Sequence, residues 1–411
     1  MSRCFVCLIV LLLGLLAVAA ATLWWLDREA ENAWVFPVQP GGIRIKIPAM
    51  QAIRLATSDW GMAILNGYQA KTRYGTVKVS REDGRLRLRC SPCVFSAKVL
   101  GDTPLELPHL EVSIRRQGNR LSGEITANEI KATWHGELNK HGINIETNLP
   151  PVPLASVYGL FRQQIPELAY ARIEGRLAMQ GSLSLPDGRW HVEPQLDIGQ
   201  VGGLGTEILR GVIPRPACSS VAAGDDNRWL KAAVIAAEDQ KFLEHRGFDP
   251  VELAAAFKLN ARQNRPVRGA STISQQVAKL LFSAGDRTPA RKLRELLYAV
   301  EMERTLGKGQ ILQIYLGIVP WGESVCGSEA AAQYYFGKPA ARLRPAEAAW
   351  LASLLRSPAM VQKDPERVML HAEKILGWMK GMGRSQRQRA MAELRSESFQ
   401  RTLYDRFRYK E

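Results

Sequence analysis

The chain has 411 residues, of which 46% are hydrophobic, and its formal net charge is +15. This length and apolar content exclude a wholly disordered chain and favour two or three domains, each with a core of its own. The positive charge favours an anionic partner such as a membrane surface, a diphosphate or a nucleic acid, without choosing among them.

An uncharged run opens the chain. Residues 5–26 contain 22 positions without a charge, which is enough for one helical crossing of a membrane. Arg3 precedes the run and Asp27 follows it, so the charge bias predicts a cytoplasmic N-terminus and an external remainder. A cleaved signal peptide is the alternative, because small residues at 17–21 offer a processing site. We predict a retained anchor over residues 1–30, because the apolar run continues beyond that site.

The next region, residues 31–200, is predicted to be rich in β-strands. Apolar and polar residues alternate in short runs there, and the longest alternation extends from Ile173 to Leu185 before a Pro-Asp-Gly turn signal. Other runs lie at 85–89, 110–114 and 130–134. Nothing in this region identifies a ligand.

Cys90 and Cys93 form a CSPC pair within the β-rich region. Export from the cytoplasm would favour a disulfide between them. A zinc site would need two more ligands at short spacing, and none is nearby. Cys218 and Cys326 stand alone in the sequence.

The residue pattern changes near residue 200, where a cluster of Gly and Pro residues predicts a domain boundary. Beyond it, apolar residues recur at spacings of three and four, as in the stripe of Leu293, Leu296, Leu297 and Val300. The second half is therefore predicted to be mostly helical, which makes the chain an α+β protein.

Glu238 and Asp239 end an apolar, helix-like stretch. Apolar surroundings would raise the pKa of such a carboxylate and suit it to act as a base. The alternative is a pair of solvated acids at a helix end.

Residues 268–279 contain a second pattern. Thr272 and Gln275 have capping-box spacing, which predicts a helix start. The free amides of that start, with Lys279 two turns on, would form an anion cradle. A well-capped helix without a ligand is the equal alternative.

A third pattern places Glu295 among four cations, Arg287, Arg291, Lys292 and Arg294. Glu295 lies off the leucine stripe and is therefore expected to point away from that packed face. The alternative is a surface pair with Arg291. From residue 258 to 308 there are eleven Lys or Arg residues and four acids, so the basic excess lies where a diphosphate would need it.

Six motifs follow one another in the second half: EDQKFLEHRGFD (238–249), RGASTISQQVAK (268–279), RKLRE (291–295), ILQIYLG (311–317), YYFGK (334–338) and AEAAWLASLLRSP (346–358). In this order they resemble the family-51 glycosyltransferases, which are the peptidoglycan polymerases, and most closely the monofunctional biosynthetic transglycosylases. The resemblance covers about residues 225–360. It implies a lysozyme-like glycosyltransferase domain at 201–365, followed by a helical tail at 366–411.

The resemblance implies that lipid II is polymerised into glycan strands by inverting transfer, with release of undecaprenyl pyrophosphate. Glu238 would deprotonate the acceptor hydroxyl, and Lys279 and Arg287 would neutralise the departing pyrophosphate. Glu295 would be the second essential carboxylate and would assist the leaving group directly or through a divalent cation, Mg or Mn. No cofactor is expected to be obligatory.

The resemblance also assigns further residues to the site. Those expected to contact substrate are Arg291, Gln275, Gln276, Ser271 and Thr272. Those expected to support the Glu238 loop are Asp239, Phe242 and His245. The expected partners are the membrane, lipid II, the growing glycan-lipid chain and, through the β-rich region, cell-wall synthesis proteins, with no nucleic acid. The implied location is the bacterial cytoplasmic membrane, single-pass, with the catalytic domain on the periplasmic face.

Two positions depart from the family pattern. Leu280 stands where an asparagine usually follows the lysine that corresponds to Lys279. Gly317 replaces the asparagine that commonly ends the YLN motif, and it is expected to loosen a helix end. A degenerate scaffold that only binds lipid-linked precursor is therefore one alternative. A lysozyme-like hydrolase is the other, although it would not need the basic cluster. No SxxK motif follows, and about 50 residues remain after Pro358, so we expect polymerisation without cross-linking.

Overall fold

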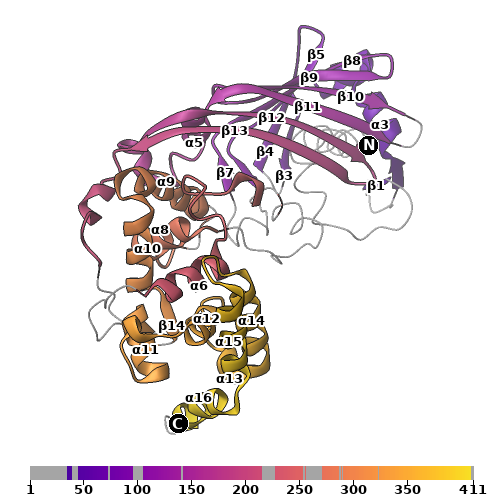
Figure 1. The fold of residues 1–411 in the computed structure, drawn as a ribbon. Coiled ribbons are helices and arrows are strands. Elements are labelled where there is room, and N and C mark those ends of the chain that lie inside the picture. The colour runs from indigo at the N-terminus through magenta and orange to yellow at the C-terminus, as the bar shows by residue number, and fades with distance from the viewer. Residues whose placement is uncertain are drawn as a thin grey trace. The chain divides into compact units, whose positions relative to one another are not determined.

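The computed structural model describes residues 35–38, 45–72, 75–95, 105–139, 142–214, 227–252, 255, 271–286, 288, 290–322 and 324–408. The chain divides into two compact units, one extending to Val201 and the other holding most residues from Gly202 onward (Figure 1). The first is built on strands and the second on helices, which confirms the predicted α+β character. The predicted anchor at 1–30 lies outside the described residues. Within the described ranges, no helix combines the length and apolarity that a membrane crossing requires.

The first unit contains a nine-stranded sheet with the order β13-β12-β11-β10-β9-β8-β5-β4-β3 (Figure 1). Its strands are β3 (Gln69–Thr72), β4 (Gly75–Glu82), β5 (Arg85–Cys90), β8 (Leu110–Gln117), β9 (Arg120–Ala127), β10 (Ile130–Leu138), β11 (Ile143–Pro153), β12 (Arg172–Leu185) and β13 (Arg189–Gly202). The four alternating runs found in the sequence all lie on these strands, as predicted.

Two short strand pairs lie outside the large sheet of this unit, and a disulfide links one of them to it. The pairs β1 (Val35–Val38) with β2 (Ile45–Pro48), and β6 (Cys93–Phe95) with β7 (Leu105–Leu107), form separate antiparallel ladders. The predicted disulfide joins Cys90 to Cys93.

Helices α3 (Ala49–Ala56) and α4 (Asp59–Leu65) share one core with the apolar face of the sheet. On β5, Leu86 and Leu88 point into this core, whereas Arg87 and Arg89 alternate with them and bind Glu111 on β8. Period-2 alternation thus sorts the strand into a buried apolar face and a charged outer face.

A glycine allows α4 to approach the end of α3. A Cβ atom on Gly61 would lie 1.9 Å from the carbonyl oxygen of Leu55, so only glycine fits this close backbone contact.

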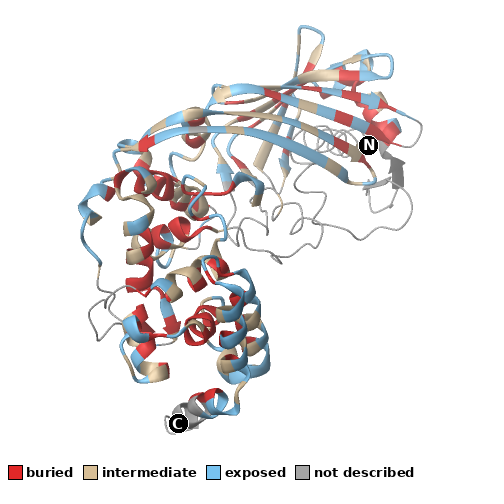
Figure 2. Cartoon of the chain, in the orientation of Figure 1, coloured by how far each residue is buried: buried red, intermediate tan, exposed pale blue. Residues whose placement is uncertain are grey.

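The second unit is helical. Its longer helices are α6 (Arg228–Glu238), α8 (Ile273–Phe282), α9 (Ala290–Thr305), α10 (Gly307–Ile318), α11 (Ser328–Phe336), α12 (Pro345–Leu354), α14 (Pro365–Trp378), α15 (Arg384–Arg395) and α16 (Glu397–Arg408). Helix α12 is buried from Ala346 to Leu354 (Figure 2), and α6 and α14 pack against it. The helices of the predicted tail contribute Ile375, Leu394 and Leu403 to the same core.

Cys326, which the sequence left without a partner, is disulfide-bonded. Gly317 lies within α10, which continues to Ile318, and the Val319 amide donates to the carbonyl oxygen of Tyr315. The expectation of a loosened helix end is therefore wrong, because the backbone hydrogen bonds of the helix extend past the glycine.

We predict that Gly61→Ala will lower the free energy of unfolding by about 1–3 kcal/mol, because the new methyl group overpacks against backbone that cannot yield. Denaturant unfolding followed by circular dichroism measures this difference. Gly159→Ala is the matched control in the same unit, since no atom lies within 4 Å of the added Cβ. Equal effects of the two substitutions would contradict the packing explanation.

Candidate active site

Glu238 is the last residue of α6, and its half-buried carboxylate accepts a hydrogen bond of 2.8 Å from the Gln276 side-chain amide. Burial raises the pKa of Glu238, and the adjacent Asp239 charge raises it further, while the Gln276 hydrogen bond and the positive charge of Arg356 lower it. The net pKa shift is upward, as the apolar stretch before Glu238 predicts. Such a carboxylate is a better proton acceptor than a solvated one.

Gln276 connects Glu238 to a third helix. Its amide oxygen accepts a hydrogen bond of 2.9 Å from the hydroxyl of Tyr315 on α10. Tyr315 is fully buried, and burial together with the Glu238 charge raises the pKa of its hydroxyl well above the usual value. The hydroxyl therefore keeps its proton and remains a donor.

Asp239 joins the loop after α6 to the start of α8. Its carboxylate accepts hydrogen bonds from His245 Nε2 at 2.9 Å and from the Ile273 backbone amide at 3.0 Å. The Asp239 and His245 side chains are each only 6% exposed. Because His245 Nδ1 accepts from the Gly247 amide, the ring donates to Asp239 through Nε2.

Phe242 lies in the loop that follows Glu238 and contacts Lys308. Phe242 is fully buried, and the Lys308 ammonium lies 4.4 Å from its ring centroid. Lys308 also binds Glu303 at 2.7 Å, and Glu303 accepts from the Ser274 hydroxyl at 2.5 Å. Asp239, Phe242 and His245 are thus held in fixed contacts within a few residues of Glu238.

The start of α8 has the predicted capping box: the Thr272 hydroxyl accepts from the Gln275 amide, and the Gln275 side chain accepts from the Thr272 amide. Both side chains are buried, with 4% and 2% exposure. They therefore stabilise the helix start and present almost no open surface to a substrate. Asp239 accepts a hydrogen bond from the Ile273 amide, so the protein's own carboxylate already binds one of the amides that the anion cradle would offer.

Glu295 is only 1% exposed, so the alternative of a solvated surface pair with Arg291 is wrong. Helix α9 is covered on more than its leucine stripe, because Ala299 and Met302 are also fully buried. The Glu295 carboxylate binds the Lys292 ammonium at 2.8 Å, and Lys292 in turn donates to the half-buried Ser271 hydroxyl at 2.6 Å. Lys292, one helical turn away, is thus a partner of the buried Glu295 carboxylate.

The other cations predicted for the site differ in exposure. Lys279 is exposed in the last turn of α8, and Arg291 is half-buried in the first turn of α9. Arg287 lies outside the described residues.

Comparison with known proteins assigns this region to a family. Residues 217–380 match the family model described as Transglycosylase. They form a transglycosylase domain. The resemblance inferred from the ordered motifs is thereby confirmed.

Curated relatives of the domain bear the name biosynthetic peptidoglycan transglycosylase. One from Nitrosomonas eutropha is 50% identical over 149 residues, covering 36% of this chain and 61% of that protein. One from an Azoarcus species is 46% identical over 151 residues, covering 36% and 65%. One from Aeromonas hydrophila is 52% identical over 139 residues, covering 34% and 59%. The chain thus spans about three fifths of the length of these relatives.

Two residues of the transglycosylase domain were not singled out from the sequence. Tyr315 lies in the ILQIYLG motif, and the exposed Arg356 follows α12 in the AEAAWLASLLRSP motif. Both motifs supported the resemblance, but nothing in their spacing related either residue to Glu238, because the relation depends on how α6, α10 and α12 pack.

The surroundings of Glu295 do not fit a metal ion. Its carboxylate is occupied by the Lys292 ammonium. Across the described ranges, no three His, Cys, Asp or Glu side chains form a group suited to hold a metal. We therefore derive no catalytic step through a divalent cation at Glu295.

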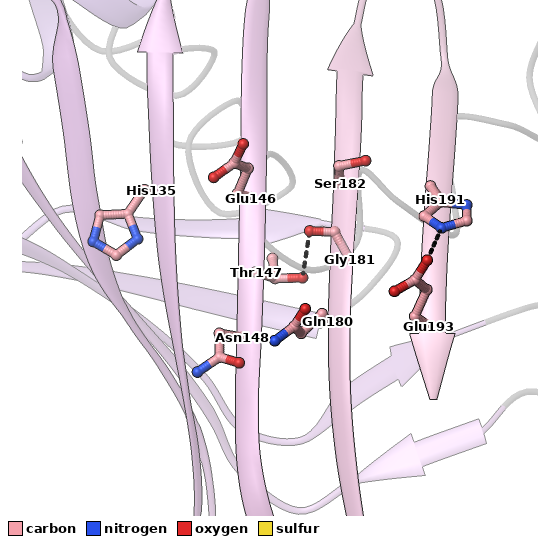
Figure 3. Close-up of a pocket in the computed structure, with 9 residues that line it drawn as sticks. All are labelled: His135, Glu146, Thr147, Asn148, Gln180, Gly181, Ser182, His191 and Glu193. Carbon is pink, nitrogen blue, oxygen red and sulfur yellow. Dashed lines mark hydrogen bonds and ion pairs between the residues drawn. The ribbon is translucent and has the colours of Figure 1, made fainter. Parts of the chain in front are cut away.

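A hollow of about 400 Å³ lies outside the transglycosylase domain, on the outer face of the sheet (Figure 3). It is lined by His135, Glu146, Thr147, Asn148, Gln180, Gly181, Ser182, His191 and Glu193. The His191 ring binds Glu193 at 2.7 Å. The hollow contains none of the predicted site residues.

The raised pKa of Glu238 has a consequence for stability. A folded-state pKa above the unfolded value of 4.5 means that the native state binds the proton more tightly, so stability from this group is fully present below 4.5 and is lost as the pH rises through the folded pKa. We predict that Glu238→Gln will stabilise the protein at neutral pH, with the difference vanishing below pH 4.5.

Urea unfolding at a series of pH values tests this stability difference. The matched control is Glu244→Gln, which changes a carboxylate 63% exposed in the following loop. A difference between Glu238→Gln and the natural protein that stays constant with pH would contradict the prediction.

Proposed function

We propose that the chain polymerises lipid II into peptidoglycan glycan strands by inverting glycosyl transfer and releases undecaprenyl pyrophosphate. The observation that carries this proposal is the placement of Glu238, a partly buried carboxylate of raised pKa held by Gln276, within a transglycosylase domain.

The growing lipid-bound glycan is the donor and lipid II is the acceptor. Glu238 takes the proton of the acceptor hydroxyl as that oxygen attacks the donor anomeric carbon. The bond to the pyrophosphate breaks on the opposite side, so the configuration inverts, as it does in inverting glycosidases that use one base and one leaving-group aid. The proton ends on Glu238 and the electron pair on the pyrophosphate.

Fixed cations stabilise the pyrophosphate as its charge develops. Lys279 is available for this role because its side chain is exposed at the end of α8. We assign Arg287 and Arg291 to the same role. Glu295 acts through Lys292, whose side chain is 43% exposed while the Glu295 carboxylate is buried, so the carboxylate fixes a cation on a partly exposed side chain. Because side-chain cations suffice for an anionic leaving group, we propose no obligatory cofactor.

We place the protein in the bacterial cytoplasmic membrane, with residues 1–30 as its single anchor and the transglycosylase domain on the periplasmic face. The uncharged run at 5–26 and the net charge of +15 support this location, as does a lipid-linked substrate. The sheet unit is proposed to bind cell-wall synthesis proteins.

We predict that Glu238→Gln will leave at most about one per cent of the polymerisation rate, since a general base contributes about 10²- to 10⁴-fold. The measurement is the conversion of fluorescent lipid II, resolved on a gel. Glu244→Gln in the same loop is the control and should retain activity, because its carboxylate is exposed.

The gel also separates the alternatives. Long chains support the proposed polymerase, shortened chains would indicate a hydrolase, and bound but unchanged lipid II would indicate the degenerate scaffold that the departure at Leu280 favours. Polymerisation that survives Glu238→Gln would remove Glu238 from its proposed role.

A further inference from the structure

Tyr315 is fully buried and cannot touch a substrate, yet it is separated from Glu238 by a single side chain. We infer that Tyr315 is a positioning residue, whose hydroxyl fixes the orientation of the Gln276 amide so that its NH₂ group faces Glu238. The inference rests on the proposed role of Glu238 as the base and adds a residue to the machinery of that site.

The Gln276 amide needs such an anchor because its two ends are alike in shape and opposite in hydrogen-bonding character. In the observed orientation, the amide nitrogen donates to Glu238 at 2.8 Å and the amide oxygen accepts from Tyr315 at 2.9 Å. Rotation by half a turn would set the amide oxygen against the carboxylate. It would also leave the buried Tyr315 proton without its acceptor, and a buried unsatisfied donor is costly.

The relay also determines which oxygen of Glu238 acts. Gln276 binds Oε2, so the other carboxylate oxygen, Oε1, is the one assigned to the acceptor hydroxyl. The charged groups that act on Glu238 from the described elements are Asp239, next to it, and Arg356, after α12. A charge at a distance changes the proton affinity of the carboxylate but does not select one rotation of it, which a directed hydrogen bond does.

The relay spans three helices. Glu238 ends α6, Gln276 lies one turn into α8, and Tyr315 lies on α10. Gln276 is the fourth residue of α8, so the capping box formed by Thr272 and Gln275 sets the helix turn from which its side chain extends. The packing of α8 against α10 then brings the Tyr315 hydroxyl within hydrogen-bonding distance.

Tyr315→Phe removes only the hydroxyl. We expect kcat/KM for lipid II polymerisation to fall about 10-fold with little change in KM, because the residue is remote from the substrate. The acid limb of the pH profile should move to higher pH, since a freely rotating Gln276 donates less to the Glu238 carboxylate and holds its pKa down less. A merely structural role would lower stability without moving the pH profile.

Tyr335→Phe is the matched control. The Tyr335 hydroxyl is also buried, belongs to the same core, and donates to the Trp321 carbonyl oxygen at 2.8 Å. Its loss costs a comparable buried hydrogen bond away from Glu238 and should leave the pH profile in place.

The deciding measurement is a direct titration of the Glu238 carboxyl by ¹³C NMR in the full-length protein, with the resonance assigned by its loss in Glu238→Gln. The titration midpoint should rise in Tyr315→Phe and stay unchanged in Tyr335→Phe. In a Gln276→Leu background, Tyr315→Phe should have no further effect, because the relay is already broken.

An unchanged midpoint in Tyr315→Phe, an equal rise in Tyr335→Phe, or a shift that persists in the Gln276→Leu background would each overturn the inference. The titration does not depend on activity. A natural protein that shows the predicted midpoints and fails to polymerise lipid II would sink the proposed function and leave the relay standing.

Discussion

The proposed chemistry depends on one conflict in the transglycosylase domain. Glu238 ends a packed helix, where burial opposes ionisation of its carboxylate, whereas the role proposed for it as a base requires that ionisation. At Glu238 the opposing influences are all identifiable. Burial and Asp239 raise its pKa, whereas the Gln276 hydrogen bond and Arg356 lower it. A base is most effective when its pKa approaches the working pH, so a partial cancellation suits catalysis better than either extreme.

Contacts around Glu238 fix the positions of the groups that shift its pKa. His245 and the Ile273 amide bind the Asp239 carboxylate and hold it in one orientation. The distance of its charge from Glu238 is therefore fixed. The same contact satisfies the first amide of α8, the helix that carries Gln276. One carboxylate therefore caps a helix and orders a loop, and the helix that it caps positions the donor to the neighbouring carboxylate.

The second carboxylate illustrates a different use of burial. Glu295 is covered almost completely, while its partner Lys292 remains 43% exposed. A buried anion that holds a partly exposed cation pre-orients that cation without exposing its own negative charge, which suits the anionic leaving group proposed for this site. The nine-stranded sheet of the first unit has a different character, with charged pairs such as Arg89 and Glu111 on its outer face and the polar hollow around His135 and His191.

The sequence by itself determined four strands of the large sheet, the Cys90–Cys93 pairing, the capping box of α8 and the family resemblance of about residues 225–360, because each depends on local spacing or on motifs in a fixed order. It did not predict the burial of Glu295 or the bond from the start of α8 to Asp239, and it overlooked Tyr315 and Arg356. Whether a helix is covered on one side or on several, and which distant side chain reaches a given amide, depends on how helices pack. Only the tertiary structure brings α6, α8 and α10 together, and that packing decides which groups act on Glu238.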